Sequence, residues 1–391
     1  MDRVRIGDIC EILNGFAFKS ENYVESGIRI IRIANVQKGY IEDSTPAFYP
    51  KDENGIEKYL LESGDLLMSL TGNVGRVAIL TDDFLPAALN QRVACLRMKT
   101  DKVSKGYLYH ILNSNYFENQ CIQAAKGVAQ KNMSTEWLKE YEIPLFPISK
   151  QAEIVSILDN VSSVIAKRQQ QLSALDDLIK ARFVELFGDP IRNPMRWDTY
   201  QLDECLERID TGKSFVCSDK PRQGIYPAVL KLSAATYGDY RPGENKALLD
   251  ESQFVIGAEV HAGDLLFTRK NTPELVGMAA YVQETPEKLM MPDLIFRLVT
   301  NERMSPIFLW QLINCKEFRP VIQGISGGSA KSMSNISKER LGKIRVICPP
   351  RKMQEQLEPF ISQIDKSKSA IQKSLDETQI LFDSLMQKYF G

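Results

Sequence analysis

The 391-residue chain is long enough for two or three domains, and its hydrophobic content of 43% supplies a core for each of them. With 49 basic and 50 acidic residues, its net charge of −1 excludes a protein whose overall field attracts nucleic acid, so such binding would depend on local patches. No apolar run approaches 18 residues, the N-terminus lacks a signal-peptide core, and the 7 cysteines form no CxxC pair. We therefore expect a cytoplasmic protein with reduced cysteines and no membrane span.

The first part of the chain, 1–147, has the pattern of an α+β domain. Short branched apolar segments favour strands, and the pair Gly64-Asp65 marks a turn that enters the strand beginning with Leu66. Helical spacing follows from Tyr107 to Ala125. The predicted strands include 28–36, 77–80 and 93–98, and an extended exit follows at 143–147.

A long helix is predicted from about Pro147 to Gly188, and we assign 148–190 to this central helical segment. Apolar residues recur every seven positions, which is the pattern of a coiled-coil seam. A lone amphipathic helix of this length needs a partner. The seam residues are Leu158, Ile165, Leu172, Ile179 and Leu186.

The second half of the chain repeats the first. A shift of 203 residues places Pro147 on Pro350, Gln151 on Gln354 and Gly188 on Gly391 without a gap, and earlier segments match at shifts of 197 to 201. This predicts a second α+β domain at 191–349 and a second helical segment at 350–391. Pro359 falls in the first turns of that helix and leaves its start open. A closed two-fold arrangement of the repeats would place the two helices antiparallel.

The sequence offers no recognisable catalytic, metal or cofactor site. The segment 327–332 comes nearest to a phosphate loop, but Ala330 stands where the glycine before the lysine is required. Neither histidine, His110 or His261, belongs to a metal-ligand cluster, and we interpret His110 as a residue on a helix surface. We therefore expect a non-catalytic protein with no cofactor and no metal.

Two loops in each half have the composition of nucleic-acid contacts. Glycine exposes backbone N–H groups to phosphate, lysine and arginine supply charge, and Asn, Gln and Arg can pair with base edges. Each loop alone is more often a solvated turn, but both loops occur in both halves. The candidate DNA-binding residues are Thr71, Gly72, Asn73 and Arg76; Lys126, Gln130, Lys131 and Asn132; Arg269, Lys270 and Asn271; and Ser329, Lys331 and Ser332.

These features together resemble the specificity (S) subunit of type I restriction–modification systems along nearly the whole chain. The carriers are the duplicated layout, the Gly-Asp-Leu-Leu strand entry at 64–67, the glycine–lysine loop before Ile-Pro-Leu-Phe-Pro at 143–147, the helix start Gln-Ala-Glu-Ile at 151–154, and the junction Leu-Phe-Gly-Asp-Pro at 186–190. The resemblance implies two tandem target-recognition domains, 1–147 and 191–349, separated by two long helices in an antiparallel coiled coil. It also implies double-stranded DNA, two S-adenosylmethionine-dependent methyltransferase subunits and restriction–translocase subunits as partners.

Two other classes of protein stay open at this stage. A stand-alone DNA-modifying enzyme would need a cofactor site or an Asn/Asp-Pro-Pro-aromatic motif, and Asn193-Pro194-Met195-Arg196 lacks the second proline and the aromatic residue. The other alternative is a coiled-coil scaffold with no DNA role.

Overall fold

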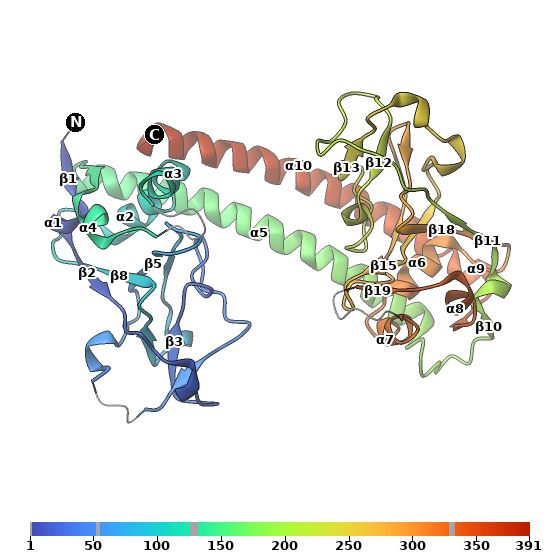
Figure 1. The fold of residues 1–391 in the computed structure, drawn as a ribbon, viewed down its shortest axis with the longest axis horizontal. Helices are drawn as coiled ribbons and strands as arrows, with labels where there is room; N and C mark the ends of the chain where they lie inside the picture. Colours follow the sequence, from blue (N-terminus) through green and yellow to red (C-terminus); the bar gives the residue numbers. More distant parts are fainter. Residues whose placement is uncertain (1, 52–54, 126–131, 328–332) are drawn as a thin grey trace. The chain divides into compact units, whose positions relative to one another are not determined.

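A computed structural model of the chain describes residues 2–51, 55–125, 132–327 and 333–391 (Figure 1). The contacts within the chain divide it into two compact units. Unit 1 comprises Met1–Gln169 together with Lys373–Gly391, and unit 2 comprises Gln170–Gln372. The division therefore falls within both long helices, so that each unit contains one globular part and a portion of each helix.

Unit 1 is built on two small sheets. The larger is fully antiparallel, and its strand β5 (Leu66–Ser69) is buried along its whole length, as its unbroken apolar run indicates. The strand order in this sheet is β2 (Cys10–Asn14), β8 (Val93–Met98), β5, β6 (Val77–Ile79). The second sheet has the order β4 (Phe48–Tyr49), β3 (Ile28–Ile31), β7 (Ala87–Leu89), and β1 (Arg3–Arg5) pairs with β9 (Glu142–Pro144).

Serine caps determine where the main helices of unit 1 begin. Ser104, Ser114 and Ser134 each accept a hydrogen bond from a backbone N–H in the first turn of the helix that follows. Ser114 thereby divides the predicted 107–125 segment into two helices. The helices are α1 (Ile6–Ile9), α2 (Lys105–Leu112), α3 (Asn115–Ala124) and α4 (Thr135–Glu140).

Unit 2 repeats this topology, which confirms the duplication predicted from the sequence. Its four-stranded sheet has the order β11 (Leu206–Thr211), β18 (Ile295–Thr300), β14 (Leu265–Thr268), β16 (Ala279–Tyr281). The three-stranded sheet has the order β13 (Asn245–Ala247), β12 (Ala228–Leu230), β17 (Leu289–Met290), and in both units its central strand runs parallel to one neighbour. The remaining pairs are β10 (Thr199–Gln201) with β20 (Arg345–Ile347), and β15 (Lys270–Asn271) with β19 (Ser334–Asn335). The shorter helices are α6 (Pro306–Asn314), α7 (Arg319–Gly324), α8 (Lys338–Gly342) and α9 (Arg351–Gln354).

The repeated Gly-Asp-Leu-Leu segment has a structural cause in both units. Gly64 (φ +82°) and Gly263 (φ +95°) adopt the left-handed conformation that glycine tolerates best. The aspartate that follows binds an arginine of the neighbouring strand. Nε of Arg97 donates a hydrogen bond to Oδ1 of Asp65 at 2.9 Å, and Arg297 forms an ion pair with Asp264 at 2.9 Å. The turn is thus bonded to the centre of the sheet, which explains why the motif occurs twice.

The predicted central helix is confirmed as α5 (Ile148–Phe187), and the second long helix is α10 (Leu357–Phe390). The second helical segment is interrupted, because α9 ends at Gln354 before α10 begins. Pro359 is the third residue of α10, where its missing N–H costs no helical hydrogen bond.

Each globular part packs on portions of both long helices. In unit 1, the core contains Ile154 and Leu158 from α5 together with Met386 and Phe390 from α10. In unit 2, the main core contains residues from the end of α5 and the start of α10, namely Ile179, Phe183, Phe187, Leu357, Ile361 and Ile364. The apolar seam predicted from the heptads therefore contributes to the cores of the units.

Candidate nucleic-acid interface

The structure brings the two predicted loops of each half together at their described residues. In unit 1, Thr71 pairs with Asn132 through an isolated antiparallel bridge. In unit 2, Lys270 pairs with Asn335 and Asn271 with Ser334 in the β15–β19 ribbon. Residues distant in sequence thus form one surface in each unit. The candidates Lys126, Gln130, Lys131, Ser329, Lys331 and Ser332 lie outside the described residues.

In unit 1, the loop after β5 presents a mixture of exposed and occupied candidates. Thr71 is buried, whereas Gly72, with φ +72°, and Asn73 are exposed. Arg76 is half-buried, and its Nη1 donates a hydrogen bond to Oε1 of Gln37. Gly72 and Asn73 can therefore contact a ligand directly, while Arg76 is oriented by the loop that carries Gln37.

In unit 2, the corresponding loop is more tightly packed. The Arg269 guanidinium lies 4.9 Å from the centre of the Phe296 ring, and its Nε and Nη2 lie 3.4 Å from Oδ1 of Asn335. Lys270 is half-buried. Asn271 is only 8% exposed, and its Nδ2 donates to the Thr236 hydroxyl at 3.2 Å. The Asn271 side chain thus holds the loop to the segment that carries Thr236.

The loop segments of the two units correspond, but their arginines do not. The N–H of Gly75 bonds to the carbonyl of Ser69, and the N–H of Gly277 bonds to that of Thr268. By this correspondence Arg76 matches Met278, one residue after the glycine, and Arg269 matches Leu70, one residue after the strand. The two units therefore place their candidate arginines at different points of the same scaffold.

His110 is not on a helix surface, so that prediction was wrong. Its side chain in α2 is buried, and its Nε2 lies 2.8 Å from Oδ1 of Asp159 in α5. Burial lowers the pKa of His110 below its ordinary value of 6.5, and the bond to Asp159 opposes this shift in part. His110 thus joins the globular part of unit 1 to the long helix, because the periodicity of α2 directs it inward.

Two glutamines that the repeat aligned, Gln151 and Gln354, attach each globular part to the helical segment that follows it, Gln151 in α5 and Gln354 in α9. The side chain of Gln151 is fully buried; it accepts from the N–H of Ser104 at 2.8 Å and donates to the carbonyls of Lys102 and Phe146 at 2.9 and 2.8 Å. The fully buried Gln354 makes the matching bonds in unit 2, where it accepts from the N–H of Ser305 at 2.7 Å and donates to carbonyls of Arg303 and Pro349. Each glutamine stands four residues after a proline, Pro147 or Pro350, and this repeated position was the sequence signal for a role that the prediction missed.

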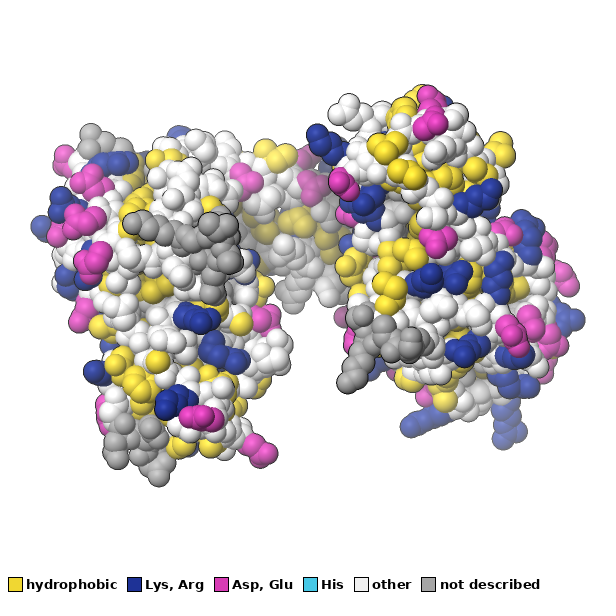
Figure 2. Space-filling view, viewed as in Figure 1, with side chains coloured by type: hydrophobic (Ala, Val, Ile, Leu, Met, Phe, Trp, Pro, Cys, Tyr) yellow, Lys and Arg dark blue, Asp and Glu magenta, His cyan; other side chains and the backbone are white. Residues whose placement is uncertain are grey.

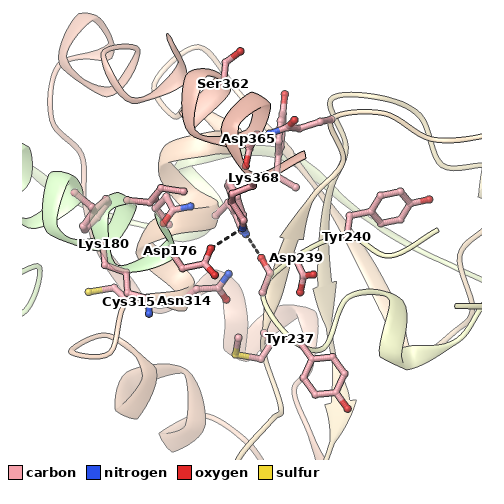
Figure 3. Close-up of a pocket in the computed structure, with 18 of the residues that line it drawn as sticks. Asp176, Lys180, Tyr237, Asp239, Tyr240, Asn314, Cys315, Ser362, Asp365 and Lys368 are labelled. Carbon is pink, nitrogen blue, oxygen red and sulfur yellow. Dashed lines mark hydrogen bonds and ion pairs between the residues drawn. The ribbon is translucent and has the colours of Figure 1, made fainter. Parts of the chain in front are cut away.

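Unit 2 contains a cavity of about 1500 Å³ that the sequence did not predict. It is lined by α5, α6, α10 and the loop 237–242, and Lys368 of α10 meets Asp176 of α5 at 2.6 Å on its wall (Figure 3). The lining includes Gln311 and Ser362, which the repeat aligns with His110 and Asp159 of unit 1. The two units thus differ in chemistry at corresponding places.

The described residues offer no group of three or more His, Cys, Asp or Glu side chains arranged to hold a metal ion. Among the helices in the described part of the chain, none is long and apolar enough to cross a membrane. All seven cysteines are free.

The fold and the paired loops define a class: a duplicated α+β unit, each copy followed by a long helix. Comparison with known proteins agrees with this class. Residues 1–175 match the family model described as type I restriction modification DNA specificity domain. Residues 1–175 are therefore similar to that domain, which agrees with the resemblance noted from the sequence.

Several relatives are specificity subunits. The type I restriction enzyme EcoEI specificity subunit of Escherichia coli is 31% identical over 204 residues, which cover 50% of this chain and 34% of that protein. The MjaVIII specificity subunit of Methanocaldococcus jannaschii is 30% identical over 177 residues, which cover 43% of this chain and 42% of that protein. These matches thus span less than half the length of either relative. The crystal structure of a type I restriction-modification S subunit from M. genitalium matches the fold with a TM-score of 0.57 at 15% identity, and the match covers 100% of this chain and 96% of that one.

Proposed function

We propose that this chain is the DNA-specificity subunit of a type I restriction–modification complex, in which each unit recognises one half of a bipartite target. The observation that carries the proposal is the duplication. Residues 1–175 match a DNA specificity domain, and the two main sheets of unit 2 repeat the strand orders of those in unit 1. A chain with two copies of one recognition fold has the domain arrangement that a split DNA site requires.

The paired loops are the proposed DNA-contacting surface of each unit. Their glycines, exposed amides and cationic side chains match the groups that contact phosphates and base edges. The scaffold is shared and the side chains differ between the units, as two different half-sites would require. Binding two half-sites with one chain gains affinity from effective concentration, and a target with one wrong half loses most of that gain.

We propose that α5 and α10 form the antiparallel coiled coil that separates the recognition domains. Two contacts in unit 2 support this direction. Asp176 of α5 meets Lys368 of α10, and further along α5 Arg182 lies over Phe360, which is nearer the start of α10. In unit 1, the start of α5 shares its core with the end of α10. The exposed faces of the helices would then dock two methyltransferase subunits and, for restriction, translocase subunits.

Methyl transfer from labelled S-adenosylmethionine to duplex DNA tests this function. The chain alone is expected to transfer no methyl group, because the sequence offers no catalytic motif. Together with the methyltransferase subunits of its system, it should direct methylation to one bipartite sequence. Transfer by the chain alone would establish a stand-alone enzyme. Methylation that continues unchanged when the chain is omitted, together with no DNA binding by the complex, would leave a scaffold.

A further inference from the structure

Four basic side chains gather around the β15–β19 ribbon of unit 2. Arg269 and Lys338 both lie over the ring of Phe296, at 4.9 and 5.7 Å from its centre. Lys270 pairs through its backbone with Asn335, to whose Oδ1 Arg269 also donates. We call Arg269, Lys270, Lys338 and Arg340 the basic ribbon.

Arg340 belongs to the same group through Gly327. A Cβ placed on Gly327 would lie 2.2 Å from Nη1 of Arg340, so the guanidinium covers this glycine directly. Gly327 in turn exchanges both backbone hydrogen bonds with Asn335, at 2.9 and 2.8 Å. Arg269 therefore contacts Asn335 itself, and Arg340 covers its bridge partner Gly327. Lys338 lies over Phe296, and its Nζ donates to the carbonyl of Ile209. Figure 2 shows lysine and arginine side chains gathered on the face of unit 2 that it presents.

The basic ribbon makes no ion pairs within the described part of the chain, although the charge of Arg340 also acts on Glu339. None of its four members forms an ion pair there, although the chain has 50 acidic residues for 49 basic ones. The nearest carboxylate in sequence, Glu339, binds Lys343 at 2.5 Å. Lys338 and Arg340 are exposed. Cations held close together without an ion-paired carboxylate repel one another, and this repulsion is relieved when an anion binds between them.

At the four matching positions of unit 1, uncharged residues replace the cations of the basic ribbon. The capping serines Ser134 and Ser337 align the helices α4 and α8, so Thr135 stands where unit 2 has Lys338, and Trp137 where it has Arg340. Leu70 and Thr71 stand at the places of Arg269 and Lys270. One backbone therefore carries four cations in unit 2 and none in unit 1, so the scaffold itself does not require them.

We infer that the basic ribbon binds the phosphate backbone of duplex DNA, so that unit 2 holds its half-site by a sequence-independent electrostatic contact through four positions that are uncharged in unit 1. This inference rests on the proposed function and assigns the anion that the ribbon takes. Arg269 and Lys338 are held in position by Phe296 rather than by a base-reading geometry. Binding a phosphate requires only positive charge and hydrogen-bond donors, which the basic ribbon supplies, and phosphates occur at every base step of a duplex.

The test is the salt dependence of DNA binding by the full chain in complex with its methyltransferase subunits. The variant Lys338→Gln/Arg340→Gln removes two exposed charges and leaves the Ser337 cap in place. Affinity is measured by fluorescence anisotropy between 50 and 200 mM salt, on the target duplex and on a duplex of unrelated sequence. Each lost phosphate contact lowers the magnitude of the slope of log affinity against log salt by about 0.9. We expect a drop of about 1 to 2 on both duplexes.

Two further variants give the matched comparisons. Lys139→Gln/Lys150→Gln removes two lysines of unit 1 that are already paired with Glu136 and Glu153, and it should leave the slope unchanged. Thr135→Lys places a cation at the unit 1 position that corresponds to Lys338 and should increase the magnitude of the slope by about 0.9. Thermal unfolding of each variant checks that the fold is retained.

An unchanged slope in Lys338→Gln/Arg340→Gln would overturn the inference while leaving the proposed function intact. So would a loss of preference for particular bases at constant slope, because that result would make the ribbon a base contact. If the unmutated complex bound no DNA at either salt concentration, the proposed function and the ribbon would both be refuted.

Discussion

Replacing Gln151 with methionine should loosen the attachment of the first globular part to α5. Methionine matches glutamine in length and fills the same buried space, but it makes none of the three hydrogen bonds to Ser104, Lys102 and Phe146. A buried polar group left without a partner costs about 1–3 kcal/mol. Lys102 is exposed, so water can reach its carbonyl, and two groups carry most of the cost. Ser104 and Phe146 are half-buried, so each group falls in the lower part of that range, and the expected loss is about 2–4 kcal/mol of local stability.

Hydrogen exchange measured by mass spectrometry resolves this loss by segment. Since about 1.4 kcal/mol corresponds to a factor of ten, amides in 100–112 and 146–158 should exchange about 30 to 1000 times faster in the variant. Gln354→Met should have the matching effect on 300–312 and 349–361 and spare the first pair of segments. Gln171→Met, on an exposed face of α5, serves as the control and should change neither. Unchanged exchange around Ser104 in the Gln151 variant would refute the role assigned to this side chain.

Three other predictions concern the buried His110, the candidate base contact Arg76 and the length of the two long helices. His110→Gln introduces the residue found at the matching place in unit 2. Because burial lowers the pKa of His110 below 6.5, the unfolded chain takes up a proton before the native chain does, and the native chain should lose stability as the pH falls from 6.5. In denaturant titrations at pH 7 and pH 5.5, the variant should lose less stability than the unmutated chain. Equal losses would show that His110 does not control this dependence. In competition binding, Arg76→Ala should relax base preference in one half-site only, by about 1–3 kcal/mol if a bidentate pair is lost. Gln37→Ala should have part of the same effect, because Gln37 accepts a hydrogen bond from Arg76. An equal loss of affinity on all sequences would instead indicate a phosphate contact. Inserting one heptad after Leu172 and one after Leu375 lengthens both helices by about 10 Å, or roughly three base pairs, so methylation-site mapping should return the same half-sequences with a longer spacer, and the old spacer would show that the helices do not set it.

The features that the sequence predicts well are those that periodicity and repetition determine. The heptads of α5 fixed its extent to within a residue, because an apolar stripe sustained over many turns has no other stable use. The duplication, seen as ordered matches at a slowly changing shift, predicted that unit 2 would repeat unit 1, and the strand orders agree. The two loops of each half were expected separately, yet Thr71 and Asn132 lie side by side.

What could not be predicted depends on contacts between distant residues. Composition marks Asn271 as a base reader, but its partner Thr236 lies on a segment that only folding brings near. His110 was misplaced for the same reason, since Asp159 lies on another helix. The basic ribbon is spread over two short segments near Phe296, 269–270 and 338–340, neither of which is a conspicuous charge run. Charge patches assembled by tertiary structure leave no local signal in a sequence.

Selection of binding sites from a random pool of duplex DNA, performed with the chain bound to its methyltransferase subunits, tests the central claim most directly. Two recognition units on one chain predict that the enriched sequences contain two short specific parts separated by a constant number of unspecified base pairs. A variant altered only in the unit 1 loop, such as Asn73→Ala, should change one part and leave the other part and the gap unchanged. Enrichment of a single uninterrupted sequence, or of none, would contradict the account.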